Sequence, residues 1–410
     1  MSRRVIGILL AAFAVYGLLL TVFLVNSKRK KEAAVSVEPI TTLSIWYWDN
    51  SVEEAFRRFA GERKDIELQF TYMPNYEYAD NLSRAVAMGE TLPDICVLQA
   101  DDLPALLNLP VWEDLSAPPY NAEKNALPRE STPFIYADNG KLIALPYNIP
   151  AGGIAYHSGA MKRIFDIDEP EELSARFPTW EALIDESVAR REESGEEFWL
   201  FSGIGDIASM LLRQTDASYL NGTTLADPQR VLHMFEVLCS LRDNELVGNI
   251  SQCSPQWYDT FSNPSYLFSP WATWLLQNGA FEKTMAQDWR VALPPEGGYA
   301  WGASFFAIPQ QSKVKAAAWE FLDFWLLSEQ GAEFHKEMPH QFLCSKVQSL
   351  TDDYCSMPLA GYGGQDVGEI FFDVLLPSMR VRPPERYTAE IDAAYEKAVE
   401  LIANNPEITA

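Results

Sequence analysis

The residues best suited to chemistry in this chain are tryptophans that stand beside carboxylates. The sequence holds 12 Trp and 17 Tyr, whose rings offer flat apolar faces with a polar tip. Trp48 is followed by Asp49, Asp101 follows an apolar run, and Trp271 follows Pro270. Aromatic rings can stack on a flat apolar ligand face, and carboxylates can accept hydrogen bonds from a polar ligand. These residue types therefore indicate a stacking site, although most of the aromatic residues must belong to the core.

Motifs for catalysis are weak in this sequence. The four histidines, His157, His233, His335 and His340, are dispersed and show no HExxH or paired-ligand spacing. GxSxG, P-loop and GxGxxG motifs are absent from the sequence. We therefore expect no metal, no cofactor and no enzymatic activity. The many carboxylates nevertheless leave a glycosidase that uses two of them open as an alternative.

The cysteines do not form a recognisable motif. Cys96, Cys239, Cys253, Cys344 and Cys355 are scattered, odd in number and without CxxC spacing. This spacing indicates neither a zinc site nor a redox motif. Cys239 could pair with Cys253, or Cys344 with Cys355, if the body lies outside the cytoplasm. We expect most of these thiols to be free and buried.

The composition is that of a globular protein that can hold two cores. The chain has 410 residues, of which 48% are hydrophobic and 22% charged, and two domains are expected for this length. Its formal charge of −25 would repel nucleic acids and anionic bilayer surfaces. We therefore expect a neutral or cationic partner and no nucleic acid.

The N-terminus contains an uninterrupted apolar run, residues 5–25, between Arg3 and Arg4 on one side and the basic residues 28–31 on the other. About 20 apolar residues span a bilayer, whereas the apolar region of a cleaved signal peptide has roughly 7 to 15. We therefore predict a membrane anchor or signal segment at 1–31, uncleaved rather than cleaved, and a linker at 32–40. The charge rule alone would leave the body cytoplasmic, because the basic cluster lies on the C-terminal flank.

The first part of the body alternates strands and helices. Strands are predicted at 43–48, 66–73 and 92–98, with helices at 52–58 and 76–88 between them. This order predicts an α/β unit with a parallel sheet, whose ligand sites lie at the C-terminal ends of the strands. Those ends bring Trp48 and Asp49 to one edge with Asp101, whereas we assign Asp102 to cap the following helix.

The middle and the end of the chain mix short strands with helices. Strands are predicted at 141–147, 154–157 and 198–204, and helices after Thr179, at 370–379 and at 389–402. The passage 148–153 is rich in Pro and Gly and suits a crossover between lobes. Within 266–276 a break at 269–270 should end a strand and place Trp271 and Trp274 on the first turn of a helix.

The spacing of the apolar residues changes within residues 301–331. An apolar run from 301 to 308 suits a buried strand, and apolar residues then recur at helical spacing. Gly331 stands where a helix C-cap is expected. We assign Trp319 and Trp325 of this helix to the core and keep Trp301 as a candidate for ligand contact.

Four passages together resemble an extracellular solute-binding protein of an ABC importer, of the carbohydrate-binding type related to maltose-binding proteins. The matching passages are LSIWYWDN; YADNLSRAVAMGETLPDICVLQADDLPAL; GKLIALPYNIPAGGIAYHSGAM with PTWEALID; and LFSPWATWL followed by DWRVALPPEGGYAWGASFFAIPQQSKVKAAAWEFLDFWLLSEQG. Each motif alone is weak, but their order and spacing between residues 43 and 331 are specific. The chain departs from the family in having no cysteine after its apolar segment that could accept a lipid.

The resemblance implies an α/β, two-lobed periplasmic-binding-protein-like fold of type II, with a ligand held between the lobes. It implies lobe one at residues 41–148 with 305–350, and lobe two at 149–304 with 351–410. The ligand contacts that it implies, residue by residue, are Trp48, Asp49, Asp101, Tyr147, Trp271 and Trp301.

The resemblance also implies what such a protein does. It would bind a sugar or oligosaccharide outside the cytoplasm and deliver it to ABC permease subunits in the membrane, and we expect it to be a monomer. For the location of the body this implication overrides the charge rule. A tethered ligand sensor that presents the closed form to a receptor is the alternative among binding proteins, and a carboxylate glycosidase is the alternative of another class.

Overall fold

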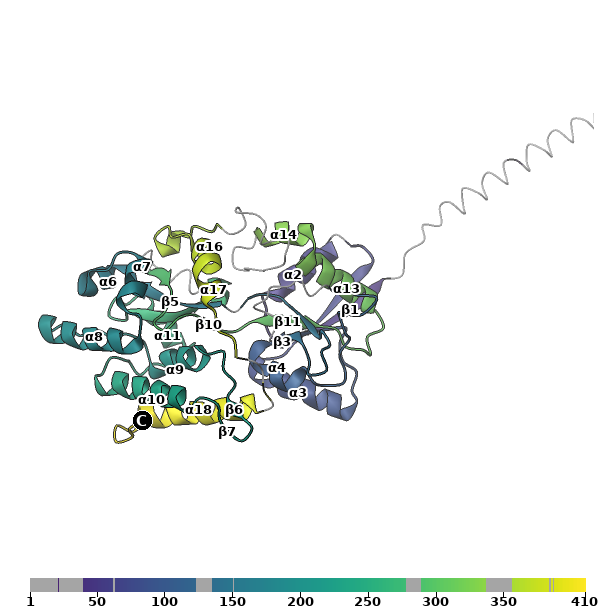
Figure 1. The fold of residues 1–410 in the computed structure, drawn as a ribbon. Coiled ribbons are helices and arrows are strands. Elements are labelled where there is room, and N and C mark those ends of the chain that lie inside the picture. Colours follow the sequence, from purple (N-terminus) through teal and green to yellow (C-terminus); the bar gives the residue numbers. More distant parts are fainter. Residues whose placement is uncertain are drawn as a thin grey trace, which may run out of the picture.

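The computed structural model describes residues 21, 40–61, 63–122, 135–149, 151–277, 289–336, 356–382, 385 and 387–410. Within these ranges the chain folds into two lobes, each with its own sheet and its own hydrophobic core (Figure 1). The predicted anchor, apart from residue 21, and the pairing of Cys344 with Cys355 lie outside the described residues. In the described ranges, no helix combines the length and the apolar character needed to cross a bilayer.

Lobe one is built on a five-stranded sheet of order β2-β1-β3-β11-β4. Its strands are β1 (Thr41–Tyr47), β2 (Ile66–Tyr72), β3 (Ile95–Gln99), β4 (Ala144–Pro146) and β11 (Ser304–Ala307). The first three strands are parallel, which confirms the predicted α/β unit. β11 is antiparallel to both of its neighbours, β3 and β4, so the chain comes back late in the sequence to complete this sheet.

The helices of lobe one pack a shared apolar core against this sheet. They are α2 (Val52–Gly61), α3 (Asn75–Met88), η1 (Ala100–Asp102), α4 (Leu103–Leu106), α13 (Lys315–Leu322), η5 (Asp323–Leu327) and α14 (Glu329–Lys336). Phe56 of α2 and Phe321 of α13 stack with ring centroids 3.8 Å apart, which joins the two ends of the lobe's sequence. α3 ends at Gly89, whose φ of 68° is a conformation that glycine adopts without strain.

Two predicted helix ends in lobe one are wrong. The helix that begins at Lys315 continues into the π-helical segment η5 and stops at Ser328, and Gly331 lies inside the next helix, α14. Glycine is needed there for close packing, because a Cβ at Gly331 would lie 2.6 Å from the carbonyl oxygen of Trp325. Asp102 precedes α4, but its side chain forms no capping hydrogen bond.

Lobe two is built around β5 (Ala151–His157), in which every residue is buried. β8 (Phe268–Ala272) pairs with one edge of β5, and β9 (Trp289–Ala292) and β10 (Tyr299–Ala300) pair with the other edge in succession. All three pairings are antiparallel. Gly152 permits a close approach, because a Cβ there would lie 2.6 Å from the ring of Tyr299.

Helices surround this second sheet. They are α6 (Ser158–Phe165), α7 (Pro170–Arg176), α8 (Trp180–Ser194), α9 (Ile204–Arg213), α10 (Pro228–Asp243), α11 (Pro255–Thr260) and η4 (Thr273–Gln277), with a small hairpin of β6 (Leu220–Asn221) and β7 (Thr224–Leu225). The predicted cap of α8 is confirmed, since Ala182 N donates to Thr179 Oγ1 at 3.3 Å. Residues 198–204 form single bridges, such as Trp199 to Tyr266, and no continuous strand.

Trp271 lies in β8 and not on the first turn of a helix as predicted. Pro270 does not end the strand, because the chain stays extended and Trp271 pairs with Gly153 of β5. Trp274, three residues later, lies on η4.

The C-terminal segment packs on lobe two. Its elements are η7 (Ala360–Tyr362), α16 (Val367–Glu369), η8 (Ile370–Leu375), α17 (Leu376–Ser378) and α18 (Thr388–Asn404). Tyr362, Phe371 and Tyr395 from this segment belong to the core of lobe two. α18 contacts α9 and α10 of lobe two and also α4 of lobe one, so it spans the two lobes along one side (Figure 1).

Candidate functional site

An open cleft lies where the two lobes meet. Clefts at the interface between domains are preferred places for small-molecule sites. Its walls come from three parts of the chain: Ala100, Asp101 and Pro104 of lobe one; Leu212, Arg213, Tyr219, Ala300 and Gly302 of lobe two; and Arg380, Arg382, Thr388 and Asp392 of the C-terminal segment.

Asp101 is the predicted site residue that lines this cleft. It stands on η1, directly after β3, at the carboxyl end of the parallel strands, and its side chain is half exposed. Its Oδ2 atom lies 3.4 Å from Nη2 of Arg213, at the end of α9. Because Asp101 belongs to lobe one and Arg213 to lobe two, this ion pair connects the lobes across the cleft.

Arginines gather at the C-terminal end of α9, whose last carbonyl groups have no partner within the helix. Arg382 donates to the carbonyl oxygens of Leu212 at 2.6 Å and Ala217 at 3.3 Å, and its guanidinium lies 3.5 Å from the ring centroid of Tyr219. Arg380 donates from Nη1 to Gln214 O at 2.9 Å. These contacts fix the C-terminal segment against α9 and bring its guanidinium groups to the cleft.

An acidic group from α18 faces these arginines. Asp392 accepts a hydrogen bond from the hydroxyl of Tyr219. Burial raises the pKa of Asp392, against the opposing effects of the Tyr219 hydroxyl and of nearby Arg213 and Arg382. Burial also lowers the pKa of Arg382. The cleft wall is therefore partly desolvated, which strengthens any interaction with a charged or polar ligand.

Three other predicted contacts, Trp48, Asp49 and Tyr147, lie near the hinge of lobe one and do not line this cleft. Asp49 accepts a hydrogen bond from Ser304 Oγ at 3.1 Å, which ties the end of β1 to the start of β11. Tyr147 is fully buried and donates to the carbonyl of Ser51 at 3.2 Å. Trp48 is half-buried against the core of lobe one, and its Nε1 is a buried donor without a partner among the described residues.

The two remaining predicted contacts, Trp271 and Trp301, belong to lobe two. Trp271 is fully buried, and its Nε1 donates to the hydroxyl of Tyr362 at 3.0 Å. Trp301 is 8% exposed and packs edge to face on Trp274, with ring centroids 4.8 Å apart. In this arrangement the indole of Trp271 is enclosed in the core, so a contact between it and a ligand remains a prediction.

Trp274 is the aromatic residue beside the cleft that sequence reasoning missed. It is half-buried, and a Cβ at Gly302, which lines the cleft, would lie 3.2 Å from Nε1 of Trp274. The signal was present in the sequence, since Trp271 and Trp274 stand three residues apart in SPWATW. Because Trp271 was predicted to be helical, the sequence did not distinguish the buried ring of Trp271 from the half-buried ring of Trp274 beside Gly302.

The basic residues of the cleft were also missed. Arg213 ends a helix, and Arg380 and Arg382 stand in a bend near the C-terminus, more than 160 residues further on. One sequence signal could have pointed to Arg380 and Arg382. The segment MRVRPPER holds three arginines within eight residues of an otherwise acidic chain.

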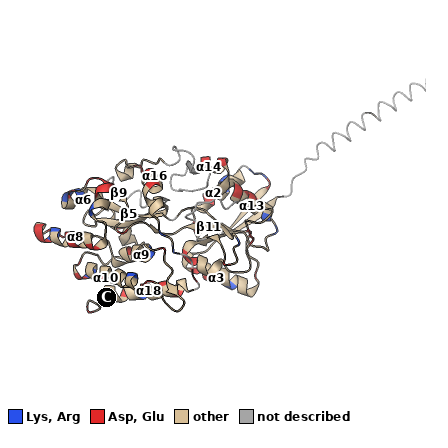
Figure 2. Ribbon diagram, viewed as in Figure 1, with Lys and Arg blue, Asp and Glu red and all other residues tan. Residues whose placement is uncertain are grey.

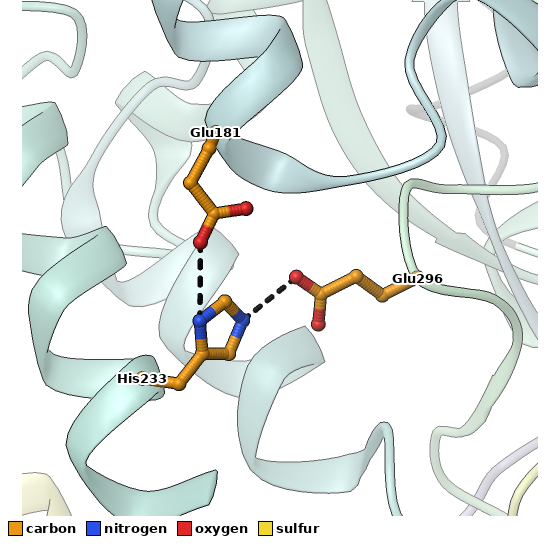
Figure 3. Close-up of side chains that lie close together, drawn as sticks. All are labelled: Glu181, His233 and Glu296. Carbon is orange, nitrogen blue, oxygen red and sulfur yellow. Dashed lines mark hydrogen bonds and ion pairs between the residues drawn. The ribbon is translucent and has the colours of Figure 1, made fainter. Parts of the chain in front are cut away.

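Glu181, His233 and Glu296, none of which lines the cleft, form a cluster in which the imidazole stands between two carboxylates (Figure 3). Nδ1 of His233 lies 3.1 Å from Glu181 and Nε2 lies 2.7 Å from Glu296. Each ring nitrogen of His233 therefore faces a carboxylate oxygen. Arg230 pairs with Glu296 at 2.5 Å and would repel a cation. The cluster therefore fits a brace that holds α8, α10 and the loop before β10 together.

Each lobe also contains a carboxyl group whose pKa burial raises to about 6. Asp206 of α9 is fully buried and accepts hydrogen bonds from Ser202 Oγ, from Gln252 Nε2 at 3.0 Å and from Trp257 Nε1 at 2.9 Å. Asp102 of lobe one differs, because its Oδ2 is buried without a hydrogen-bond partner in the described part of the chain. Its neighbouring carboxylates add to the effect of burial on its pKa.

The acidic residues of the chain are distributed differently from these arginines. Asp and Glu residues lie on outer helices such as α8 and α14 (Figure 2), whereas Arg213, Arg380 and Arg382 lie at the cleft.

The described cysteines form no disulfide. Cys96, Cys239 and Cys253 are free thiols, so the possible pairing of Cys239 with Cys253 does not occur.

Two α/β lobes that are joined by crossovers and enclose a cleft define a protein that binds a small solute between its lobes. The chain belongs to the family of bacterial extracellular solute-binding proteins, whose sequence model matches residues 54–340. The body is therefore extracytoplasmic. A search of curated proteins finds no match.

Solved structures share the fold at low sequence identity. A protein described as extracellular solute-binding protein family 1 has a TM-score of 0.78 at 17% identity, over 90% of this chain and 95% of that one. An ABC-transporter-associated binding protein from B. animalis subsp. lactis, solved with β-1,6-galactobiose, has a TM-score of 0.70 at 16% identity, over 90% and 94%. The sugar-binding protein MalE from Xanthomonas citri has a TM-score of 0.68 at 17% identity, over 90% and 93%.

Proposed function

We propose that this protein binds a sugar or oligosaccharide in the cleft between its lobes and delivers it to the permease subunits of an ABC importer. The observation that carries the proposal is the match of the solute-binding family over residues 54–340 on a fold with a cleft between two lobes. Support for a sugar comes from similar folds solved with saccharides, such as lacto-N-biose and cycloalternan.

Ligand binding in this proposal uses both lobes. Asp101 accepts hydrogen bonds from sugar hydroxyls, and Tyr219, which lines the cleft on the side of lobe two, offers aromatic surface. Trp274 and Trp301, which pack on each other beside Gly302, add aromatic surface in this proposal. Trp48, Asp49, Tyr147 and Trp271 remain proposed contacts that would need the lobes to move relative to this arrangement. Binding then shifts an equilibrium between open and closed forms, and the closed form is what a permease recognises.

The N-terminal apolar segment is proposed to tether the body to the membrane, in place of release or a lipid anchor. A tethered, monomeric binding protein would present its ligand close to the permease. A tethered sensor that presents the closed form to a receptor uses the same site and remains the second candidate.

A thermal-shift screen with mono- and oligosaccharides tests the proposal. At a ligand concentration of 100 Kd, binding stabilises the folded state by about 2.7 kcal/mol, which is a measurable rise in Tm. We expect one saccharide class to give this shift with one-to-one stoichiometry and without release of reducing sugar. Release of reducing sugar on turnover would support a carboxylate glycosidase instead, and a screen without any stabilising saccharide would contradict the proposal.

A further inference from the structure

The cleft is lined by more basic than acidic side chains, whereas the chain as a whole is strongly acidic. The chain has a formal charge of −25, yet three arginines and two aspartates line the cleft. From charge alone we expected a neutral or cationic partner. A low-dielectric cleft responds to the charges that line it more than to screened charges on the outer surface.

Two of these arginines have no acidic partner within hydrogen-bonding reach in the described part of the chain. Most arginines in the described ranges pair with a carboxylate, among them Arg57, Arg163 and Arg290. Arg380 and Arg382 form no ion pair with any residue that the structure describes, although 57 acidic residues are present in the sequence. A cation without a carboxylate at the edge of a binding cleft is a feature that an anionic ligand would complete.

The donors available to a ligand come mainly from Arg380 and Arg213. Arg382 is used by the protein, since it donates to two carbonyl groups and stacks on Tyr219. Arg380 is exposed and uses Nη1 for Gln214 O, and within the described residues its Nε and Nη2 atoms form no hydrogen bond. Arg213 meets Asp101 at 3.4 Å, longer than the roughly 2.7 to 2.9 Å of a strong charged hydrogen bond.

A purely structural role does not account for all three arginines. One guanidinium, that of Arg382, already holds the end of α9 with two hydrogen bonds. Arg380 adds one further bond to this region, and it also lines the cleft. A planar guanidinium can bind a carboxylate through two parallel hydrogen bonds, which a hydroxyl cannot match.

We propose that the ligand of this cleft is an acidic saccharide, whose anionic group binds Arg380 and Arg213 while its hydroxyls bind Asp101. This inference rests on the proposed function and narrows its ligand class. The anionic group is a uronate carboxylate or a sugar phosphate, which share the same recognition by guanidinium groups. Binding of the acid to Arg213 replaces the long ion pair between Asp101 and Arg213, so that both residues contact the ligand and hold the lobes together.

Calorimetry on matched sugars tests this inference. The full chain is kept in a polyoxyethylene detergent that contains no sugar, and is titrated with glucose, glucuronate and glucose 6-phosphate, with the galactose series, and with digalacturonate and 1,4-linked galactobiose. We expect at least one acidic sugar to bind about ten-fold or more tightly than its neutral counterpart at low salt. This preference should shrink at high salt, because the ion pairs are partly exposed. Glucuronate and glucose 6-phosphate separate the two kinds of anionic group.

Three variants show whether Arg380 is responsible. Arg380→Gln should reduce the ratio of acidic to neutral affinity to near one, and Arg380→Lys should restore part of it because the charge returns without the fork. Arg163→Gln is the matched control. It removes an arginine of α6 that is paired with Glu196, and it should leave the ratio of acidic to neutral affinity unchanged. Tm measurements establish that each variant is folded.

The outcomes separate this inference from the function on which it rests. Neutral sugars that bind as tightly as acidic ones, or an Arg380→Gln variant that weakens both by the same factor, would overturn the acidic ligand and leave sugar binding intact. If no sugar of either class binds, the proposed function itself fails.

Discussion

The two lobes bury sheets of similar size, but they assemble them from the sequence in different ways. In lobe one, β1, β2 and β3 follow one another with a helix between each pair and form three adjacent parallel strands, with β1 in the middle. In lobe two, β5 pairs with β8, β9 and β10, which come more than 100 residues later. The parallel part of lobe one is therefore built from segments that are close in the sequence, and β11 joins it from a distant segment, whereas the whole sheet of lobe two depends on pairing between distant segments.

The largest expected effect is loss of such a distant contact. Trp271→Ala would leave a cavity in lobe two and remove the hydrogen bond to Tyr362, so we expect a loss of about 3 to 5 kcal/mol in the free energy of unfolding. Urea denaturation followed by circular dichroism measures it. Trp274→Ala, which truncates a half-buried ring, is the matched control and should cost less than half as much. Equal losses for the two variants would contradict the distinction between Trp271 as a core ring and Trp274 as a half-buried ring.

The buried carboxyl of lobe two should be harder to replace than that of lobe one. Asp206→Asn places an amide N–H group against donors from Ser202, Gln252 and Trp257, so one or more of these donors loses its acceptor. We expect a loss of about 2 to 3 kcal/mol at pH 7, measured in the same urea experiment. Unchanged stability would indicate that the three hydrogen bonds around Asp206 contribute little to this lobe.

The equivalent change in lobe one, Asp102→Asn, should raise the free energy of unfolding instead of lowering it. The folded-state pKa of Asp102, about 6, lies above the ordinary value of 3.8, so the folded protein holds the proton more tightly. Its contribution to stability is therefore present at pH 4 and is lost as the pH rises to about 6. Asp102→Asn removes this loss, and we expect it to stabilise the protein by about 1 to 2 kcal/mol at pH 7.5.

A pH series gives the control for that prediction. The advantage of Asp102→Asn over the unchanged protein should disappear at about pH 3, below the ordinary pKa of 3.8, where the carboxyl is mostly protonated in both the folded and the unfolded chain. An advantage that is equal at about pH 3 and at pH 7.5 would mean that its cause is not the charge of Asp102.

The smallest effect is expected at the contact between the lobes. Asp101 is half exposed and its pair with Arg213 is long, so Asp101→Asn should reduce the free energy of unfolding by less than about 1 kcal/mol. Thermal unfolding at low and high salt measures this change, and the difference between the two proteins should vanish at high salt. A larger loss would mean that the lobes stabilise each other strongly even without ligand.

The sequence predicted lobe one better than lobe two for a physical reason. Alternation in β1 and helical periodicity in α2 and α3 are local properties, and Asp101 followed from them because it stands directly after β3. The position of Trp271 depended on whether Pro270 ends a strand, and that is decided by pairing with β5 and not by Pro270 itself. No local pattern carries that information.

The arginines of the cleft illustrate the same limit. Arg213 and Arg382 meet because α9 and the C-terminal segment pack together, and no spacing in the sequence connects residues so far apart. The net charge of the chain sums over all of its residues, so it does not predict which charges line the cleft.

The place of β11 in the sheet of lobe one has a consequence for synthesis of the chain. β11 lies between β3 and β4, so the five-stranded sheet is incomplete until residue 307 has been made. At a ribosomal rate of about 5 to 20 residues per second, the roughly 160 residues that separate β4 from β11 take on the order of 10 to 30 s. During this interval the nascent chain carries β3 with one edge unpaired, the kind of edge that invites wrong pairing. Any protein that meets the nascent chain in this interval therefore meets lobe one with this edge of β3 still open.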